Sequence, residues 1–264
     1  MSQKISGLHH VTAITSDAQK NIDFYCGVLG LRLVKRTVNF DDPRSYHLYY
    51  GDELGRPGTI LTFFAWPGAY RGRIGAPQVS STAFAIPKGS IDFWKKRLEA
   101  NGVSYEVAPA RFGDQVLTFT DFDGMQIELV ATDDPRAPWA AGTVPTEHAI
   151  RGFHSVSLSE SDQEVTAEVL TKTMGFTAAG VDGNRFRYVG ADASGGVVDL
   201  LNVPGSKAGS MGAGTVHHVA FRTPDDASEA KWRRQLTEEG FHVSPVMDRN
   251  YFHSIYFREP GGVL

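Results

Sequence analysis

The chain has 264 residues, 41% of them hydrophobic and 21% charged, which is enough to build one large domain or two ordinary ones. A formal net charge of −4 gives no basic field, so we expect neither nucleic acid nor a membrane surface as a partner. One cysteine, no apolar run of membrane-spanning length and no hydrophobic segment in the N-terminal MSQKISG favour the reducing cytoplasm over secretion or a membrane.

Four segments of the chain follow one plan: a short alternating strand, a stretch of helical period, then two or three strands, the last entered through a glycine-rich turn. The first covers about residues 7–67, with the strand LHHVTAIT, the helix AQKNIDFYCGVLG and the strands LRLVKRTVNF, SYHLYYGD and TILTFFAW. The second covers about residues 78–132, with the strand VSSTAFAIP, the helix SIDFWKKRLEANG and the closing strand in FTDFDGMQIELVAT.

The third and fourth segments repeat this plan after a stretch that reads as a linker. APWAAGTVPTEHA is rich in Ala, Pro, Gly and Thr, so we divide the chain into halves at 1–140 and 147–264. The third segment carries GFHSVSLS, QEVTAEVLTKTMG, NRFRYVGA and GGVVDLLNV; the fourth carries TVHHVAFRT, SEAKWRRQLTEEG and SIYFREPGGVL. The sequence therefore predicts an α+β fold of four βαβββ modules, two per half, whose curved mixed sheets surround cavities.

Histidine pairs open the first strand in two of the four segments. The aligned pairs, in chain order, are His9-His10, Ser80-Ser81, His154-Ser155 and His217-His218. The second position thus reads His, Ser, Ser, His. This pattern predicts that the first and fourth segments face each other across one cavity, while the second and third enclose another without a metal.

Two imidazoles from facing strands make half of a metal site, and iron sites with open positions commonly add one carboxylate. Because neighbouring residues of a strand point to opposite faces, we expect His10 to share a face with Thr12 and His9 to lie on the other face unless the strand bends. A buried histidine is more often a packing residue, but the repeated pair favours metal ligation. The histidines read as surface, packing or structural residues are His47, His148, His154 and His242; His253 has no assigned role.

The third ligand is expected in the last strand of the fourth segment. Placing Phe119 on Phe257 puts Gln126 on Leu264, so the counterpart of Glu128 falls two residues past Leu264. The first segment has Thr62 at this position. We expect a chain cut short relative to its gene product; the other interpretation is that the protein lacks this ligand.

The set LHHVTAIT, YHLYYGDELGRPGTILTFF, AIPKGSIDFW, RFGDQVLTF, RGFHSV and DRNYFHSIYFREPGGVL resembles the vicinal oxygen chelate superfamily, which includes glyoxalases and extradiol dioxygenases. The chain is most similar to the ring-cleaving dioxygenases that act on hydroquinones. This resemblance implies Fe(II) as cofactor, with Mn(II) as an alternative, dioxygen as co-substrate and a small aromatic substrate. It implies His10 and His218 as metal ligands, and five residues around them: His9, Thr12, His217, Arg249 and Tyr256.

The chemistry of these residue types agrees with that resemblance. A histidine beside the metal, His217 or His9, can take a proton from a bound hydroxyl, and Arg249 suits an anionic oxygen. Tyr256 can donate a hydrogen bond to the same region. The residues Phe63, Phe64, Trp66 and Tyr251 can wall an aromatic substrate or simply pack a core.

Two other functions fit the same fold. A glyoxalase-type isomerase or lyase normally needs a second carboxylate ligand, against which Thr62 argues. A non-catalytic resistance protein that sequesters an aromatic compound usually lacks the metal histidines. The sequence leaves open whether the chain forms a homo-oligomer.

Overall fold

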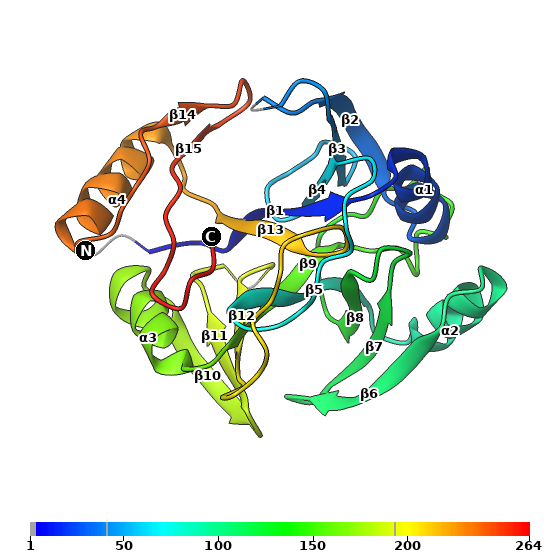
Figure 1. The fold of residues 1–264 in the computed structure, drawn as a ribbon. Helices are drawn as coiled ribbons and strands as arrows, with labels where there is room; N and C mark the ends of the chain where they lie inside the picture. The colour runs from blue at the N-terminus through cyan, green and yellow to red at the C-terminus, as the bar shows by residue number, and fades with distance from the viewer. Residues whose placement is uncertain (1–3, 41, 193) are drawn as a thin grey trace.

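The structure, a computed structural model, describes residues 4–40, 42–192 and 194–264. Its elements follow the four predicted segments, here called units 1 to 4 (Figure 1). Unit 1 comprises β1 (Leu8–Thr15), α1 (Ala18–Ile22), the π-helical η1 (Asp23–Val28), β2 (Arg32–Val38), β3 (Tyr46–Gly51) and β4 (Ile60–Ala65). Unit 2 comprises β5 (Gln78–Pro87), α2 (Ile91–Ala100), β6 (Tyr105–Arg111), β7 (Asp114–Thr120) and β8 (Gln126–Thr132).

The second half of the chain repeats this order. Unit 3 comprises β9 (Gly152–Glu160), α3 (Gln163–Glu168), the π-helical η2 (Val169–Thr173), β10 (Thr177–Asp182), β11 (Arg185–Val189) and β12 (Val197–Asn202). Unit 4 comprises β13 (Val216–Phe221), α4 (Asp226–Glu238), β14 (Met247–Asp248) and β15 (His253–Ser254). Among the described residues, no helix combines the length and apolar character that crossing a membrane requires.

The strands form two large mixed sheets that join units distant in sequence. The first has the order β13-β1-β4-β3-β2 and the second β10-β11-β12-β9-β5-β8-β7-β6. Units 1 and 4 meet through the antiparallel pair β1–β13, and units 2 and 3 through β5–β9. The α+β fold and the predicted partnership of the first and fourth segments are therefore confirmed.

Units 1 to 3 close in the same way, because the first strand of each pairs in parallel with its last strand: β1 with β4, β5 with β8, and β9 with β12. In unit 4, the Val219 N–H donates to the Leu264 carbonyl at 3.1 Å. The strand predicted over SIYFREPGGVL is wrong for nearly all of its length, since only its first residue, Ser254, belongs to a strand. Without a ladder of partners, the residues that follow do not form a regular strand.

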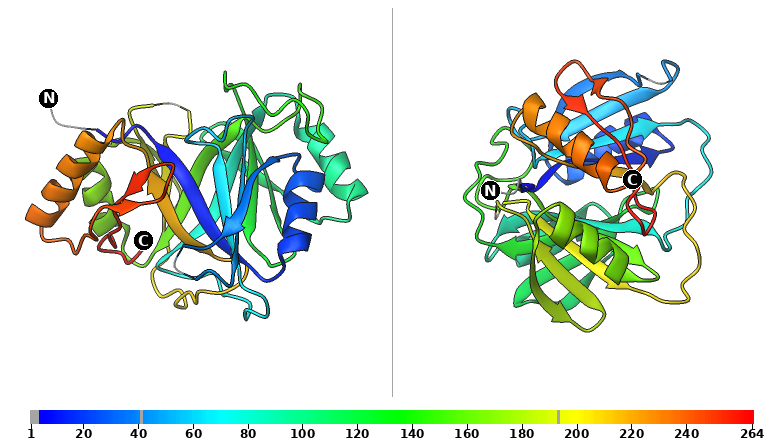
Figure 2. Two further views of the ribbon diagram at one scale, coloured as in Figure 1. Left: turned by 90° about the horizontal axis from the view of Figure 1, so that it is seen from above. Right: turned by 90° about the vertical axis from the view of Figure 1, so that its left-hand side faces the viewer.

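The helices lie at the two ends of the molecule, with α1 and α2 at one end and α3 and α4 at the other (Figure 2). Asp17 caps α1 by accepting hydrogen bonds from the Gln19 and Lys20 amides. After η1, Gly30 has φ 71°, a left-handed conformation that glycine adopts without a steric penalty, and it ends the helical segment as predicted.

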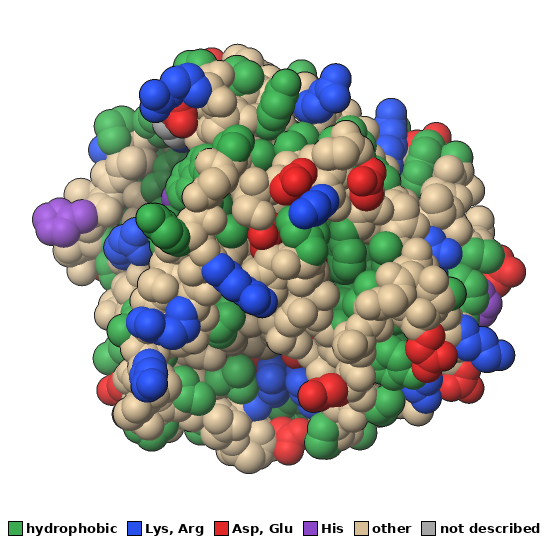
Figure 3. Space-filling model, turned by 45° about the vertical axis from the view of Figure 1, so that its right-hand side comes forward, with side chains coloured by type: hydrophobic (Ala, Val, Ile, Leu, Met, Phe, Trp, Pro, Cys, Tyr) green, Lys and Arg blue, Asp and Glu red, His purple; other side chains and the backbone are tan. Residues whose placement is uncertain are grey.

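Acidic and basic side chains are interspersed on the face of the molecule shown in Figure 3.

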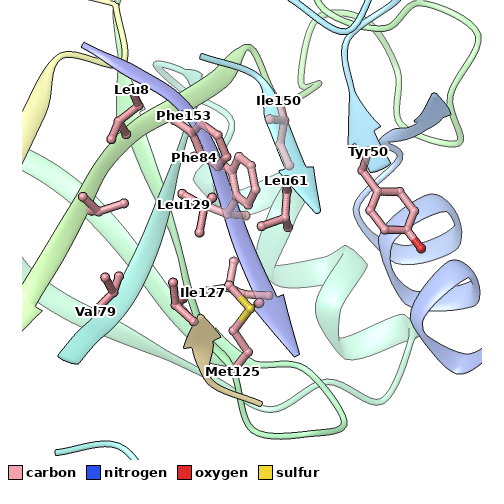
Figure 4. Close-up of a cluster of buried hydrophobic side chains, with 14 of the residues drawn as sticks. Leu8, Tyr50, Leu61, Val79, Phe84, Met125, Ile127, Leu129, Ile150 and Phe153 are labelled. Carbon is pink, nitrogen blue, oxygen red and sulfur yellow. The ribbon is translucent and has the colours of Figure 1, made fainter. Parts of the chain in front are cut away.

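Most buried apolar side chains of both sheets form one connected cluster. At the centre of the long sheet, Phe84 of β5 stacks on Phe153 of β9 with ring centroids 5.2 Å apart, and both are fully buried (Figure 4). Each such side chain contributes roughly 1.5–3 kcal/mol of hydrophobic stabilisation. This core packs against one face of β1 and β13, so the opposite face of these two strands can carry polar groups.

The long sheet carries ion pairs at the positions where the sequence predicts a cavity without metal. Asp199 of β12 accepts hydrogen bonds from both Arg185 and Arg187, at 2.9–3.0 Å. Glu128 of β8 pairs with Arg111 at 2.7 Å. Arginines therefore neutralise these two buried carboxylates.

Glu160 should make the protein less stable as the pH rises. Glu160 is the last residue of β9 and is 1% exposed. Burial, followed by the charge of Glu259, raises its pKa from 4.5 to about 8. The folded state therefore binds this proton more tightly than the unfolded state. The free energy of unfolding is predicted to fall between about pH 4.5 and pH 8, by roughly a few kcal/mol in total.

The variant Glu160→Gln removes this titration, so we expect it to raise the melting temperature at pH 8.5 and to change it little at pH 4.5. The exposed Glu164→Gln on α3 is the control and should change neither value. Thermal unfolding followed by circular dichroism measures both. Equal effects of Glu160→Gln at the two pH values would contradict the assignment.

Candidate active site

Two buried histidines face each other across the β1–β13 pair. The Nε2 atoms of His10 and His218 lie 3.2 Å apart, and both side chains are less than one-tenth exposed. Two nitrogens bound to one ion at about 2.1 Å each, at nearly a right angle, stand about 3 Å apart. The spacing of the two imidazoles therefore suits joint ligation of a single ion.

The outer histidine of each pair lies against the inner one. The Nδ1 atoms of His9 and His10 are 2.9 Å apart, as are those of His217 and His218. The four rings thus form one continuous series. The Nε2 atoms of the two inner histidines contact each other, and the Nδ1 atom of each inner histidine contacts the outer histidine beside it. Such a contact on the second nitrogen fixes the orientation of a ligating imidazole.

The ladder between β1 and β13 explains how all four rings reach one cavity. Its register skips His9 on β1, between the pairs Leu8–Phe221 and His10–Ala220. It skips His217 on β13, where His218 pairs with Thr12 and Val216 pairs with Ala13. Each outer histidine is the extra residue of a bulge, which re-aims its side chain. The expectation that only one histidine of each pair points inward is therefore wrong.

Three imidazoles of the site, those of His9, His10 and His218, are held in the neutral form. Burial, followed by the charge of His217, lowers the pKa of His218 to about 3. Burial lowers the pKa of His10 well below its usual value, with His218 as the next cause, and burial followed by Arg222 lowers that of His9 to about 4. Neutral imidazole is the form that ligates metals.

The other predicted residues stand around the same cavity. The Thr12 and Thr62 hydroxyl oxygens are 2.8 Å apart, and the Tyr256 ring packs edge-on at 5.6 Å from the ring of His218. The Arg249 guanidinium lies 5.5 Å from the centre of the Tyr256 ring. The cavity measures about 730 Å³ and brings together all seven predicted residues: His9, His10, Thr12, His217, His218, Arg249 and Tyr256.

Apolar side chains form most of the remaining wall. Phe64, Trp66 and Tyr251 line the cavity, and the Phe64 and Trp66 rings are stacked. Phe252 packs against both His9 and His10, with ring centroids 5.0 and 5.5 Å away. Phe63 does not belong to this wall, because it points from β4 into the core; the ring packs on Tyr25 and Tyr50.

His47 and Tyr49 of β3 also line the cavity, and the sequence interpretation missed them. His47 was read as a surface or packing residue; the surface reading is wrong, whereas packing is confirmed, since its ring is buried in the cavity wall, packed on Phe64 and hydrogen-bonded to Tyr49 and Thr62. Their signal was the alternation in SYHLYYGD, where Leu48 and Tyr50 take the core face and leave the other face to these two residues.

The remaining histidines have other surroundings. His148 stacks on Phe93 and bonds Ser90, which confirms its packing role. His154 lies 3.0 Å from the Ser155 hydroxyl and close to Asp114, within the ion-pair region of the long sheet. His242 is exposed, and the exposed His253 pairs with Asp226.

The position of the third ligand can be traced through the ladders. Thr62, Glu128 and Asp199 stand at one equivalent place, each opposite the residue two positions beyond the second histidine or serine of its unit. Leu264 lines the cavity beside β13, and the predicted glutamate lies outside the described residues. No three His, Cys, Asp or Glu side chains within 4–40, 42–192 and 194–264 are grouped to hold a metal ion. The third ligand stays a prediction.

Comparison with known proteins gives consistent matches. The sequence profile of the Glyoxalase/Bleomycin resistance protein/Dioxygenase superfamily matches residues 7–129 and 152–264. "Putative ring-cleaving dioxygenase MhqO" of Bacillus subtilis is 48% identical over 265 residues, 100% of this chain and 84% of that protein. The chlorohydroquinone/hydroquinone 1,2-dioxygenase of Sphingobium indicum is 37% identical over 277 residues, 100% of this chain and 85% of that protein.

A solved structure matches over the same length. The crystal structure of a "putative dioxygenase" from Bacillus subtilis superposes with a TM-score of 0.96 at 48% identity, over 99% of this chain and 84% of that one. The fold described above is thus shared with a protein whose name indicates oxygen chemistry.

Proposed function

The chain belongs to the Glyoxalase/Bleomycin resistance protein/Dioxygenase superfamily, and within it we propose that the protein is an Fe(II)-dependent dioxygenase that opens the ring of a substituted hydroquinone. Relatives named as ring-cleaving dioxygenases support an oxygenase role over the full length of the chain. The observation that carries the proposal is the approach of two neutral, buried imidazoles to 3.2 Å inside an aromatic-walled cavity.

The residues present fit one side of a metal ion. His10 and His218 would hold it through Nε2, with His9 and His217 against their other nitrogens. Fe(II), or Mn(II) in its place, would supply open positions for substrate and dioxygen and acidify a bound hydroxyl. The third ligand would be the glutamate predicted two residues past Leu264.

The chain's own residues would position the substrate and its protons. The aromatic ring would lie against Phe64, Trp66 and Phe252, in a wall that excludes water. His9 or His217 would accept the proton of the hydroxyl that approaches the inner histidines, because each outer ring lies within the same cavity. Arg249, beside Tyr256 on the same wall, would stabilise negative charge on oxygen.

Thr62 argues against an isomerase of the glyoxalase type. This reaction normally needs a second carboxylate, and the equivalent place in unit 1 carries a hydroxyl bonded to Thr12. A non-catalytic binding protein would have no need for the matched histidine bulges on β1 and β13. Both alternatives are therefore less well supported than ring cleavage.

Dioxygen uptake with matched substrates tests the proposal. The full gene product, loaded anaerobically with Fe(II), is given methylhydroquinone and then catechol in a sealed oxygen-electrode cell. We expect rapid uptake with the hydroquinone and little with catechol, because the proposed site receives one oxygen of a para diol, whereas catechol offers two oxygens on neighbouring carbons. Faster uptake with catechol would shift the proposal to catechol cleavage, and no uptake with either would contradict dioxygenase function.

A further inference from the structure

A row of side chains crosses the whole five-stranded sheet on its cavity face. The ladders place His218 of β13 opposite Thr12 of β1, Thr12 opposite Thr62 of β4, Thr62 opposite Tyr49 of β3, and Tyr49 opposite Lys35 of β2. All five residues line the cavity. The row therefore runs from the candidate metal ligand His218 to the outer strand β2, and every residue in it carries a polar group.

Three hydrogen bonds join the middle of this row. The Tyr49 hydroxyl lies 2.9 Å from Nδ1 of His47, and Nε2 of His47 lies 3.0 Å from the Thr62 hydroxyl. The Thr62 hydroxyl lies 2.8 Å from that of Thr12. These four groups contain four mobile protons for three hydrogen bonds, so one proton is left over at an end of the chain. The Tyr49 hydroxyl can therefore either accept a further hydrogen bond or donate one, depending on the direction in which the three hydrogen bonds run.

This hydrogen-bonded series begins at Thr12, beside His218, and ends at Tyr49, three strands away from His218. The Phe64 ring contacts His217 on one side, at 5.4 Å, and His47 on the other, at 4.6 Å. Three strand spacings separate His218 from Tyr49, roughly 14 Å at the backbone, and side chains on the inner face of a curved sheet converge. The cavity of about 730 Å³ that these residues line has room above the small side chains of Thr12 and Thr62 for one aromatic ring with an oxygen at each end.

We infer that Tyr49, oriented by His47, binds the substrate oxygen para to the one held at His10 and His218. This inference rests on the proposed function, because it requires a hydroquinone in the cavity. The two oxygens of a hydroquinone point away from opposite ends of the ring, and only the first is accounted for by the histidines. A ring lying along the row brings the second to Tyr49, with Lys35 behind it, 5.6 Å from the centre of the Tyr49 ring. Tyr49 then distinguishes hydroquinones from monophenols.

Binding to the Fe(II)-loaded protein without oxygen tests this role apart from turnover. Isothermal titration calorimetry compares hydroquinone with 4-methylphenol, which has the same shape but one hydroxyl. We expect the wild type to bind hydroquinone about tenfold more tightly, as one additional hydrogen bond warrants. In Tyr49→Phe this preference should shrink to less than about twofold, with the affinity for 4-methylphenol unchanged.

Two further variants separate recognition from a general effect on the fold. Tyr46→Phe removes a hydroxyl from the exposed start of the same strand and should keep the full preference. Thr82→Val, a buried site in the other sheet, should do the same. Retention of the preference in Tyr49→Phe, or equal weakening of both ligands, overturns the inference while leaving the proposed function intact. A wild type that binds neither ligand overturns the proposed function as well.

Discussion

Replacing His218 with alanine is expected to lower the affinity for Fe(II) by more than about 100-fold and to abolish turnover. Loss of a group that merely orients a ligand costs about 10- to 100-fold in metal affinity, so loss of the ligand itself should cost more. The same result is expected for His10→Ala, because the two Nε2 atoms face each other at 3.2 Å and would hold the ion together. Iron per chain after anaerobic loading and desalting, measured by mass spectrometry, checks the prediction.

His9→Ala is the informative companion to this variant. His9 lies against the Nδ1 atom of His10, so its loss should leave iron bound at saturating Fe(II) and slow turnover by about 10- to 100-fold. The control is His253→Ala, on an exposed ring paired with Asp226, which should leave both iron content and rate unchanged. Full iron and full activity in His218→Ala would show that the site has been placed wrongly.

Asp199→Ala is expected to destabilise the protein by about 3–5 kcal/mol, the largest effect on stability that we predict. The carboxylate is 1% exposed and receives two parallel hydrogen bonds from Arg187 and one from Arg185. Both arginine side chains are 11% exposed, so removing their shared partner leaves two buried cations with too few acceptors. Urea unfolding followed by fluorescence measures the change.

The matched control is Asp133→Ala, since Asp133 forms an ion pair with Lys88 in which both side chains are mostly exposed. That pair should contribute little to stability, because water screens the attraction between exposed charges. A change below about 1 kcal/mol in Asp199→Ala would mean that Arg185 and Arg187 find other acceptors. The ion pairs of units 2 and 3 would then not be needed to hold that sheet together.

The histidine pairs could be predicted as a metal site because the same weak motif occurs twice, at equivalent places in two segments. One HHV strand means little, but two at equivalent places, with serine at the other two, point to a single shared cavity. The alternation of β1 and β13 correctly placed His10 and Thr12 on one face. The pairing of the first and fourth segments followed from the same comparison and is confirmed by the β1–β13 ladder.

Other features depend on contacts that a single sequence does not display. The bulges at His9 and His217 arise from the register between strands some two hundred residues apart, so a strict alternation placed the outer histidines on the wrong face. The place of His47 in the cavity wall was not predicted, because a single histidine in a strand does not reveal its partners. The tail of unit 4 was read as a strand because it resembles β8, although a strand also needs a neighbour.

The central claim is that the cavity around His10 and His218 opens an aromatic ring with dioxygen. The most direct measurement is a single turnover of the Fe(II)-loaded protein with methylhydroquinone under ¹⁸O₂, with the product analysed by mass spectrometry. Our account predicts a ring-opened acid that carries both atoms of one dioxygen molecule. The variant His218→Ala should form no such product. Formation of the quinone with release of hydrogen peroxide, or a product without ¹⁸O, would contradict it.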